Sequence, residues 1–285
     1  MSGVINGNVV LAVAANLIPQ AVAIGAYAAR YAGVTTRRIA TAISLFSLLV
    51  TASRLAALFM TPSLGALADS KANAALRAGL KAVPPGELHV FDLQMRIIVA
   101  AGSVGILIGA LMLPLFLAGF TRGISSFERR GSIPHALFRL LDPRVMMWLL
   151  GHLRPRRFSL ADFPISSVPR KLLVANVVLY AVYSVGVVAA YYASVVDLGA
   201  RTTASGLSGL VNGIGTIAFA LFIDPTTALI VDQTVRDERP RRDVAAMIFW
   251  LIVTAFLGTL LAQLILLPAA QYIAAVAHIW PHGTL

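Results

Sequence analysis

The chain has 285 residues, of which 58% are hydrophobic and 12% are charged, whereas soluble domains carry about 25% charged residues. This composition excludes a soluble globular domain and predicts an all-α polytopic membrane protein, and the lack of cysteine excludes disulfides, thiolate catalysis and cysteine-based metal sites. The net charge of +11 does not indicate nucleic-acid binding, because the arginines lie between apolar runs, as they do in cytoplasmic loops.

Six apolar runs have the length of about 20 residues that a helix needs to span a bilayer. The residues before the first run include no lysine or arginine, so we interpret that run as a retained helix rather than a cleaved signal peptide. The second and fifth runs can continue past a proline as far as Asp69 and Asp232. The six runs are residues 9–29, 39–60, 97–120, 172–196, 204–223 and 244–270.

Lysine and arginine are shared unevenly between the loops. The loops after runs one, three and five carry 17 of the 23 basic residues, the loops after runs two and four carry five, and Arg54 lies inside run two. Basic residues accumulate in cytoplasmic loops. We therefore predict that the three arginine-rich loops face the cytoplasm and that both termini lie outside.

Two stretches of the chain match each other at one constant offset in residue number. Each consists of an arginine, a long apolar run, a proline and then an aspartate, and Leu58-Phe59 aligns with Leu221-Phe222 in the same way. The pairs that match at this offset are Arg38 and Arg201, Pro62 and Pro225, and Asp69 and Asp232.

Three helices in each copy would insert the second copy upside down relative to the first. The sequence therefore predicts a 3+3 inverted repeat, a plan that is common among secondary transporters. Residues 1–120 would form the first three-helix repeat and residues 170–285 the second, with a basic cytoplasmic loop at residues 121–169 between them.

That central loop interleaves apolar residues with arginines. One interpretation is an interfacial element that lies on anionic membrane lipids with Trp148 at headgroup depth. The other is an ordinary basic loop that contains one short buried helix.

Arg54 is the most informative single residue, because an arginine near the middle of a membrane span costs about 2.5–3.5 kcal/mol on insertion scales. Such a side chain is expected to face a cavity or a partner. A guanidinium donates paired hydrogen bonds to phosphate oxygens, so Arg54 is a candidate anion ligand. The alternative is a structural ion pair or a contact with backbone carbonyls.

Asp224-Pro225 ends the fifth run, and Thr61-Pro62 takes the corresponding place in the second. Proline removes one backbone donor and clashes with the preceding turn. Each proline therefore predicts either a broken helix that lines a cavity or a helix that ends at the membrane interface.

The repeated charges also suggest gates. In the predicted orientation Arg38 and Asp232 lie on the cytoplasmic side, whereas Arg201 and Asp69 lie outside. We hypothesise two symmetry-related ion pairs, Arg38–Asp232 and Arg201–Asp69, as inner and outer gates. The alternative is that these are unpaired interfacial charges at helix ends.

Neither a metal site nor a bound cofactor is predicted. The five histidines show no HExxH spacing. The glycines between residues 206 and 215 lie in an apolar helix with no preceding strand, so they do not predict a phosphate-binding loop.

Three blocks of the chain resemble parts of one known protein family. YAARYAGVTTRRIATAISLFSLLVTASRLAALFMTPSLGALAD at residues 27–69 is similar to that family's N-terminal region. RTTASGLSGLVNGIGTIAFALFIDPTTALIVDQ at residues 201–233 and LGTLLAQLILLPAA at residues 257–270 are similar to its C-terminal half. The blocks recur in order, and the helix layout agrees along the chain, so the chain resembles the Amj family of bacterial lipid II flippases.

The resemblance implies translocation of the undecaprenyl-pyrophosphate-linked peptidoglycan precursor, lipid II, from the inner to the outer leaflet of the bacterial cytoplasmic membrane. Arginines at three depths would then bind the pyrophosphate in succession as it crosses the membrane. They are Arg30, Arg37 and Arg38 at the inner mouth, Arg54 at the midplane and Arg201 at the outer mouth. Two other classes stay open: a membrane-embedded polyprenyl-pyrophosphate phosphatase, which needs acid, base or nucleophilic residues near the arginines, and a non-transporting scaffold of cell-wall synthesis. No oligomeric state is predicted.

Overall fold

The computed structural model describes residues 4–130, 143–151 and 159–279, and these residues form helices and turns with no strand. Six helical segments are long and apolar enough to cross a membrane, which confirms the predicted number of spans. They are Gly7–Thr36 (α1, Gly7–Ala23, and α2, Gly25–Thr36), Ile39–Arg77 (α3, Ile39–Ala57, and α4, Met60–Arg77), Pro85–Leu111 (α5), Arg170–Val196 (α9), Arg201–Val235 (α10, Arg201–Ala218, a π-helical turn η3, Phe219–Ile223, and α11, Asp224–Val235) and Arg241–Ala277 (α12).

The third span does not lie where the sequence predicted it. The predicted run covers residues 97–120, but α5 begins at Pro85 and ends at Leu111. The sequence did not predict the first part of this span, because its charged residues are typical of a loop. In the structure these charges are paired, since Arg96 Nε donates to Asp92 Oδ2 at 2.7 Å and Lys71 pairs with Glu87.

The chain turns out of the bundle at Met112, two residues before Pro114, and continues as α6 (Leu113–Arg130). α6 crosses the predicted boundary at residue 120 and has an apolar and a polar face. The short helix α8 (Pro143–Leu150) follows, and two single 3-10 turns at residues 160–162 and 165–167 lead to α9. The rest of the predicted interfacial loop, residues 131–142 and 152–158, lies outside the described residues.

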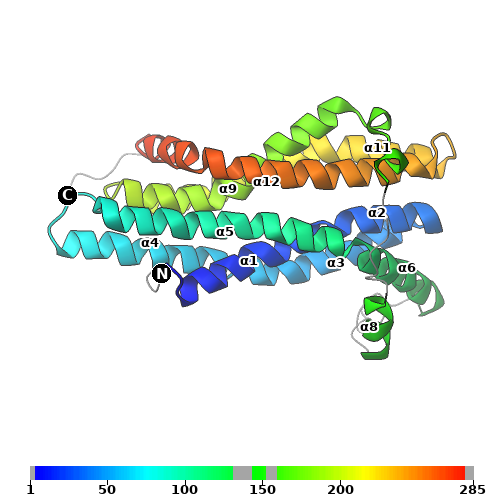
Figure 1. Cartoon of the computed structure of the whole chain (residues 1–285), viewed down its shortest axis with the longest axis horizontal. Helices are drawn as coiled ribbons and strands as arrows, with labels where there is room; N and C mark the ends of the chain where they lie inside the picture. Colours follow the sequence, from blue (N-terminus) through cyan, green and yellow to red (C-terminus); the bar gives the residue numbers. More distant parts are fainter. Residues whose placement is uncertain (1–3, 131–142, 152–158, 280–285) are drawn as a thin grey trace.

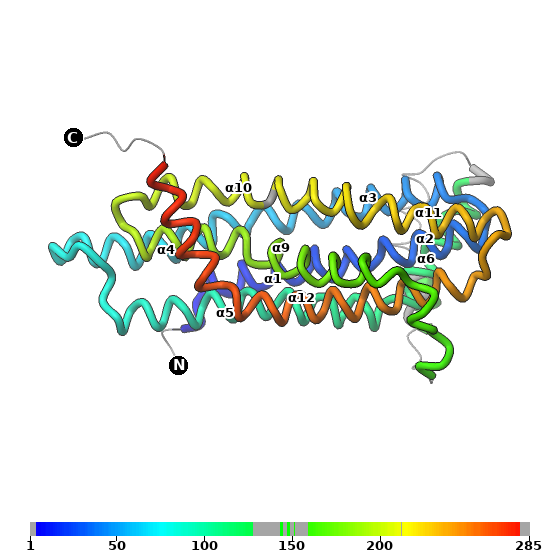
Figure 2. The backbone as a smooth tube through the Cα atoms, turned by 90° about the horizontal axis from the view of Figure 1, so that it is seen from above, coloured from blue at the N-terminus to red at the C-terminus, as the bar shows by residue number. Residues whose placement is uncertain are grey.

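The first and third spans run in one direction, and the fourth and sixth spans run in the opposite direction. In Figures 1 and 2, α1–α2 and α5 run toward the end that carries α6 and α8, whereas α9 and α12 run away from it. The turns at residues 37–38 and 236–240 share that end, which we call the arginine-rich end. Toward the other end, here called the terminal end, lie the turns at residues 78–84 and 197–200, the start of α1 and the end of α12 (Figure 1).

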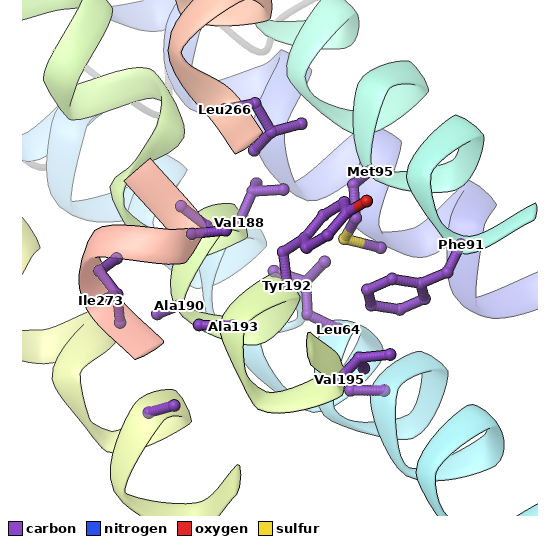
Figure 3. Close-up of a cluster of buried hydrophobic side chains, with 14 of the residues drawn as sticks. Leu64, Phe91, Met95, Val188, Ala190, Tyr192, Ala193, Val195, Leu266 and Ile273 are labelled. Atoms are coloured by element: carbon purple, nitrogen blue, oxygen red, sulfur yellow. The ribbon is translucent and has the colours of Figure 1, made fainter. Parts of the chain in front are cut away.

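An apolar cluster joins the halves near the terminal end. Phe91 and Met95 on α5 pack beside Tyr192 on α9, and the rings of Phe91 and Tyr192 meet edge-on with centroids 5.6 Å apart (Figure 3). Leu64 on α4 and Leu266 on α12 belong to the same cluster, and both are fully buried. Side chains from four spans therefore fix α4 against α9.

The first and third spans of each half are held together by the same two features, an asparagine hydrogen bond and a close contact at a glycine. Asn16 on α1 donates to Ile98 O on α5 at 2.8 Å, and Asn176 on α9 donates to Leu251 O on α12 at 2.9 Å. Two helical turns after each acceptor stands a glycine, Gly105 on α5 or Gly258 on α12. The missing side chain lets the backbone of the first span approach closely, as small residues do in membrane helix pairs.

Adding a methyl group at either glycine is expected to destabilise the bundle by about 1–3 kcal/mol, as overpacking typically does. A Cβ at Gly105 would clash with the carbonyl of Leu17, and one at Gly258 with the carbonyl of Val177. Thermal unfolding of Gly105→Ala and Gly258→Ala in one detergent measures the loss. Gly206→Ala is the control, because its Cβ would meet open space, and an alanine there is expected to be neutral or slightly stabilising. Equal melting temperatures in all three variants would contradict the packing argument.

Candidate functional site

A pocket of about 410 Å³ lies between the two halves, within the size range of about 300–1,000 Å³ that ligand sites show. We call it the central pocket. The first half contributes α1, α2, α3 and the start of α4, and the second half contributes α9, η3 and the start of α11. It is lined by Ala15, Asn16, Pro19, Gln20, Ala23, Ala26, Tyr27, Arg30, Phe46, Val50, Ser53, Arg54, Ala57, Met60, Thr61, Tyr180, Tyr183, Ser184, Val187, Phe219, Ile223 and Asp224.

One face of the first span forms a wall of this pocket. Its lining residues recur every three or four positions, the spacing that places side chains on one side of a helix. The stripe runs from uncharged amides to a cation: Asn16, Gln20, Ala23, Tyr27 and Arg30. The small residues along it leave room beside the helix backbone.

Arg54 lies in the central pocket, on α3 and within one turn of the α3–α4 interruption at Leu58-Phe59. The residue is exposed, and it makes no ion pair or hydrogen bond with any residue that the structure describes. Tyr183 on α9 lines the same pocket. A structural ion pair, the alternative interpretation of Arg54, is therefore not formed among the described residues.

A second arginine of the pocket is paired across the two halves. Arg30 Nη2 on α2 donates to Asp224 Oδ1 at the start of α11, at 2.7 Å. A carboxylate at a helix N-terminus is favoured by the helix dipole, so Asp224 both begins α11 and holds Arg30. The pair forms the end of the pocket that faces the arginine-rich end.

Both predicted proline positions coincide with helix interruptions at the pocket. Pro62 follows the break between α3 and α4, and Pro225 stands in the first turn of α11 directly after the π-helical turn η3. Thr61, Ile223 and Asp224 line the pocket. The geometry thus matches interrupted helices that line a cavity rather than helices that end at the interface.

Neither predicted gate pair is formed in this structure. Arg201 donates to Asn73 Oδ1 at 2.9 Å instead of pairing with Asp69. Asp232 lies 3.8 Å from Arg236, one turn along the same helix, instead of pairing with the first half.

The arginine-rich end is bridged by a different pair, Arg37 and Asp237, at 2.8 Å. Backbone geometry explains this choice of partners, because Arg37 ends α2 with φ 58° and Asp237 follows α11 with φ 59°. Left-handed residues reverse the chain direction, and here both reversals bring their side chains together across the halves. The sequence did not indicate this pair, because the two left-handed residues are not glycines, the residue type that usually marks such a turn.

At the terminal end, Asp197 orders the turn before α10. Its Oδ1 accepts from the N–H groups of Gly199 and Ala200, and its Oδ2 lies 2.5 Å from His278 Nε2. Burial raises the pKa of Asp197, but the hydrogen bonds from His278 and from the two backbone groups outweigh it and hold the pKa below its usual value. The carboxylate is therefore ionised at neutral pH and fixes the start of the span that carries Arg201.

The structure divides the predicted site residues into three groups. Arg30, Arg54 and Asp224 come together in the central pocket. Arg37, Arg38 and Asp232 lie toward the arginine-rich end, and Arg201 and Asp69 lie toward the terminal end. The sequence interpretation missed Asn16 and Gln20, although their four-residue spacing on the face that carries Arg30 was a usable signal.

The pocket presents a guanidinium and neutral polar groups that can bind a ligand. Asp224 is the one carboxylate among its lining residues, it is engaged by Arg30, and the lining includes no histidine. No group of three or more histidine, aspartate or glutamate side chains suited to a metal ion occurs within the described part of the chain.

Comparison with known proteins gives one consistent result. The family model described as Amj, Alternate to MurJ, matches residues 2–277. The chain is 32% identical over 251 residues to the protein named Lipid II flippase Amj of Bacillus subtilis (strain 168). The aligned region covers 87% of this chain and 89% of that protein. No solved structure matches the chain.

Proposed function

The chain belongs to the Amj family, and on that premise we propose that it is a lipid II flippase. It moves the undecaprenyl-pyrophosphate-linked peptidoglycan precursor from the inner to the outer leaflet of the bacterial cytoplasmic membrane. It acts as a transporter, and lipid II is its partner molecule.

The observation that carries this proposal is the unpaired Arg54 in a pocket between the halves. A pyrophosphate loses its hydration when it enters the membrane, and charge-assisted hydrogen bonds from a guanidinium replace that hydration. Arg54 has no partner among the described residues, so its donors are available to such a ligand.

The outer faces of the two interrupted spans suit the polyprenyl tail. Large apolar side chains stand exposed beside both interruptions, and Leu58 and Phe59 match Leu221 and Phe222 at the repeat offset. They are Leu55, Leu58 and Phe59 on the first half and Ile217, Leu221 and Phe222 on the second. The tail can stay in lipid along these faces while the headgroup occupies the pocket.

An inverted repeat would explain how one pocket serves both leaflets. Opposite helix directions, the paired interruptions and the shared asparagine–glycine packing of first on third spans all support it (Figures 1 and 2). In such proteins the site lies between the repeats, and access alternates by movement of one against the other.

The described part of the central loop supports contact with anionic lipids. α6 is strongly amphipathic, and the guanidinium of Arg122 lies 4.7 Å from the ring centre of Trp148 on α8. Cationic amphipathic helices with tryptophan lie in the interface of anionic membranes.

The experiment that tests the proposed function is rescue. A bacterium depleted of its other lipid II flippase is expected to resume growth and peptidoglycan synthesis when it expresses this chain. Purified protein in liposomes should move lipid II without releasing phosphate. Phosphate release would favour the phosphatase alternative, and rescue by an Arg54 variant that cannot flip lipid II would favour the scaffold.

The proposed orientation predicts that a reporter fused after Leu285 is outside the cytoplasm. Alkaline phosphatase at that position should therefore be active, because it needs the oxidising exterior to form its disulfides. The same enzyme inserted at the arginine-rich turn after α11 should be inactive. The reverse pattern would overturn the orientation and with it the assignment of inner and outer ends.

A further inference from the structure

The central pocket contains an uncharged polar region that the arginines do not explain. Gln20 on α1 is 6% exposed and lines the pocket, yet its amide makes no hydrogen bond with any described residue. Asn16, one turn earlier, uses Nδ2 on Ile98 O, and its Oδ1 has no described partner. Ser184 on α9 also lines the pocket, and its Oγ is buried without a hydrogen bond to any described residue.

Buried polar groups are normally hydrogen-bonded. An amide that is almost wholly covered, yet lies against a pocket with its donors and acceptor unused, is therefore suited to a ligand. A primary amide offers two donors and one acceptor without charge. Such a group recognises hydroxyl and amide groups rather than phosphate.

Helix geometry places this region beside Arg54. Gln20 lies almost as far before the turn at residues 37–38 as Arg54 lies after it, on the next span, which runs back antiparallel. At a rise of about 1.5 Å per residue, both are about 25 Å from the turn that joins their spans. When Arg54 binds a phosphate, the group attached to that phosphate therefore lies at about the same depth in the bundle as Gln20.

We propose that Gln20 and Asn16 form a sugar-binding subsite that holds the saccharide attached to the pyrophosphate of the transported lipid. The proposal rests on the proposed function, since it assumes that Arg54 holds the pyrophosphate. Two neighbouring parts of the pocket then bind different parts of one headgroup: the guanidinium binds the anion, and the neutral amides bind the hydroxyl and acetamido groups of the sugar.

The test compares two ligands on the same full-length protein in lipid nanodiscs. Lipid II carries the sugars, and undecaprenyl pyrophosphate lacks them. Gln20→Met is expected to bind lipid II about five- to tenfold more weakly than the wild type, with binding of undecaprenyl pyrophosphate unchanged, because about one neutral hydrogen-bonding group is lost. Gln20→Ala, which cannot crowd the pocket, should give the same change in the ratio of the two affinities.

Gln94→Met is the matched control. Gln94 is a buried amide on α5 that donates to Val4 O and does not line the pocket, so its substitution should leave the ratio of affinities unchanged. An unaltered ratio in both Gln20 variants, or an equal loss for both ligands, would overturn the sugar subsite. Wild-type protein that binds neither lipid would instead overturn the proposed function.

Discussion

Replacing Arg54 with glutamine is expected to abolish lipid II flipping while the protein still inserts and folds. The guanidinium is unpaired among the described residues and faces the central pocket, so its removal breaks no internal contact there. Each charge-assisted hydrogen bond contributes about 1.5–3 kcal/mol, so the loss of two of them weakens pyrophosphate binding by about 100-fold or more. The measurement is lipid II movement in liposomes, together with rescue of flippase-depleted cells.

Two further variants separate charge from geometry and from general effects. Arg54→Lys keeps the cation but loses the planar pair of donors, so it should retain reduced transport. Arg77→Gln removes an exposed arginine at the end of α4, outside the pocket, and should leave transport unchanged. Wild-type flipping by Arg54→Gln at normal abundance would refute the role of this residue.

The sequence predicted the spans well because the bilayer imposes a simple rule of length and apolarity. It failed at residues 85–96, where the helix contains Asp92 and Arg96. Their pairing on one helix face, and the contact of Arg96 with Gln263 O on α12, make these charges compatible with a packed helix. Pairing between spans depends on tertiary packing, which a local count of apolar residues does not contain.

The site was partly predictable for a similar reason. Arg54 and Asp224 stood out because charge inside an apolar run is costly, and both line the pocket. Gln20 did not stand out, because a neutral amide costs less and is often a packing residue, as Asn176 proves to be through its bonds to Leu251 O and Thr254. What distinguishes the two amides is the presence of a partner, and that is known only when the spans are assembled.

The gates illustrate the limit of repeat spacing. Arg38 and Asp232 each match a counterpart in the other half at the same offset, yet the ion pairs between the halves within the described residues are Arg30–Asp224 and Arg37–Asp237. A sequence repeat identifies equivalent positions, whereas an ion pair requires side chains that meet. The pairs that form lie at the arginine-rich end, so they close the pocket toward the side that we propose to be cytoplasmic.

Locking this end is expected to stop transport. Since the chain has no native cysteine, a double variant that carries Arg37→Cys and Asp237→Cys can be joined selectively by a short bifunctional thiosulfonate linker. Both side chains are accessible, at 61% and 70% exposed. If the headgroup enters between α2 and α11, the linked protein should lose flipping almost completely, and a reductant that cleaves the linker should restore it.

The control places the same linker within one half. Asp232→Cys lies on α11 and Arg236→Cys directly after it, one turn apart near the same end, and the two native side chains are similarly exposed. Linking them adds the same chemistry but does not join α2 to α11, so transport should continue. If the protein linked across the halves flipped lipid II at the wild-type rate, separation of the halves at this end could not be part of the transport cycle. Loss in the cross-half variant alone would instead identify Arg30–Asp224 and Arg37–Asp237 as contacts that must open before the pyrophosphate reaches Arg54.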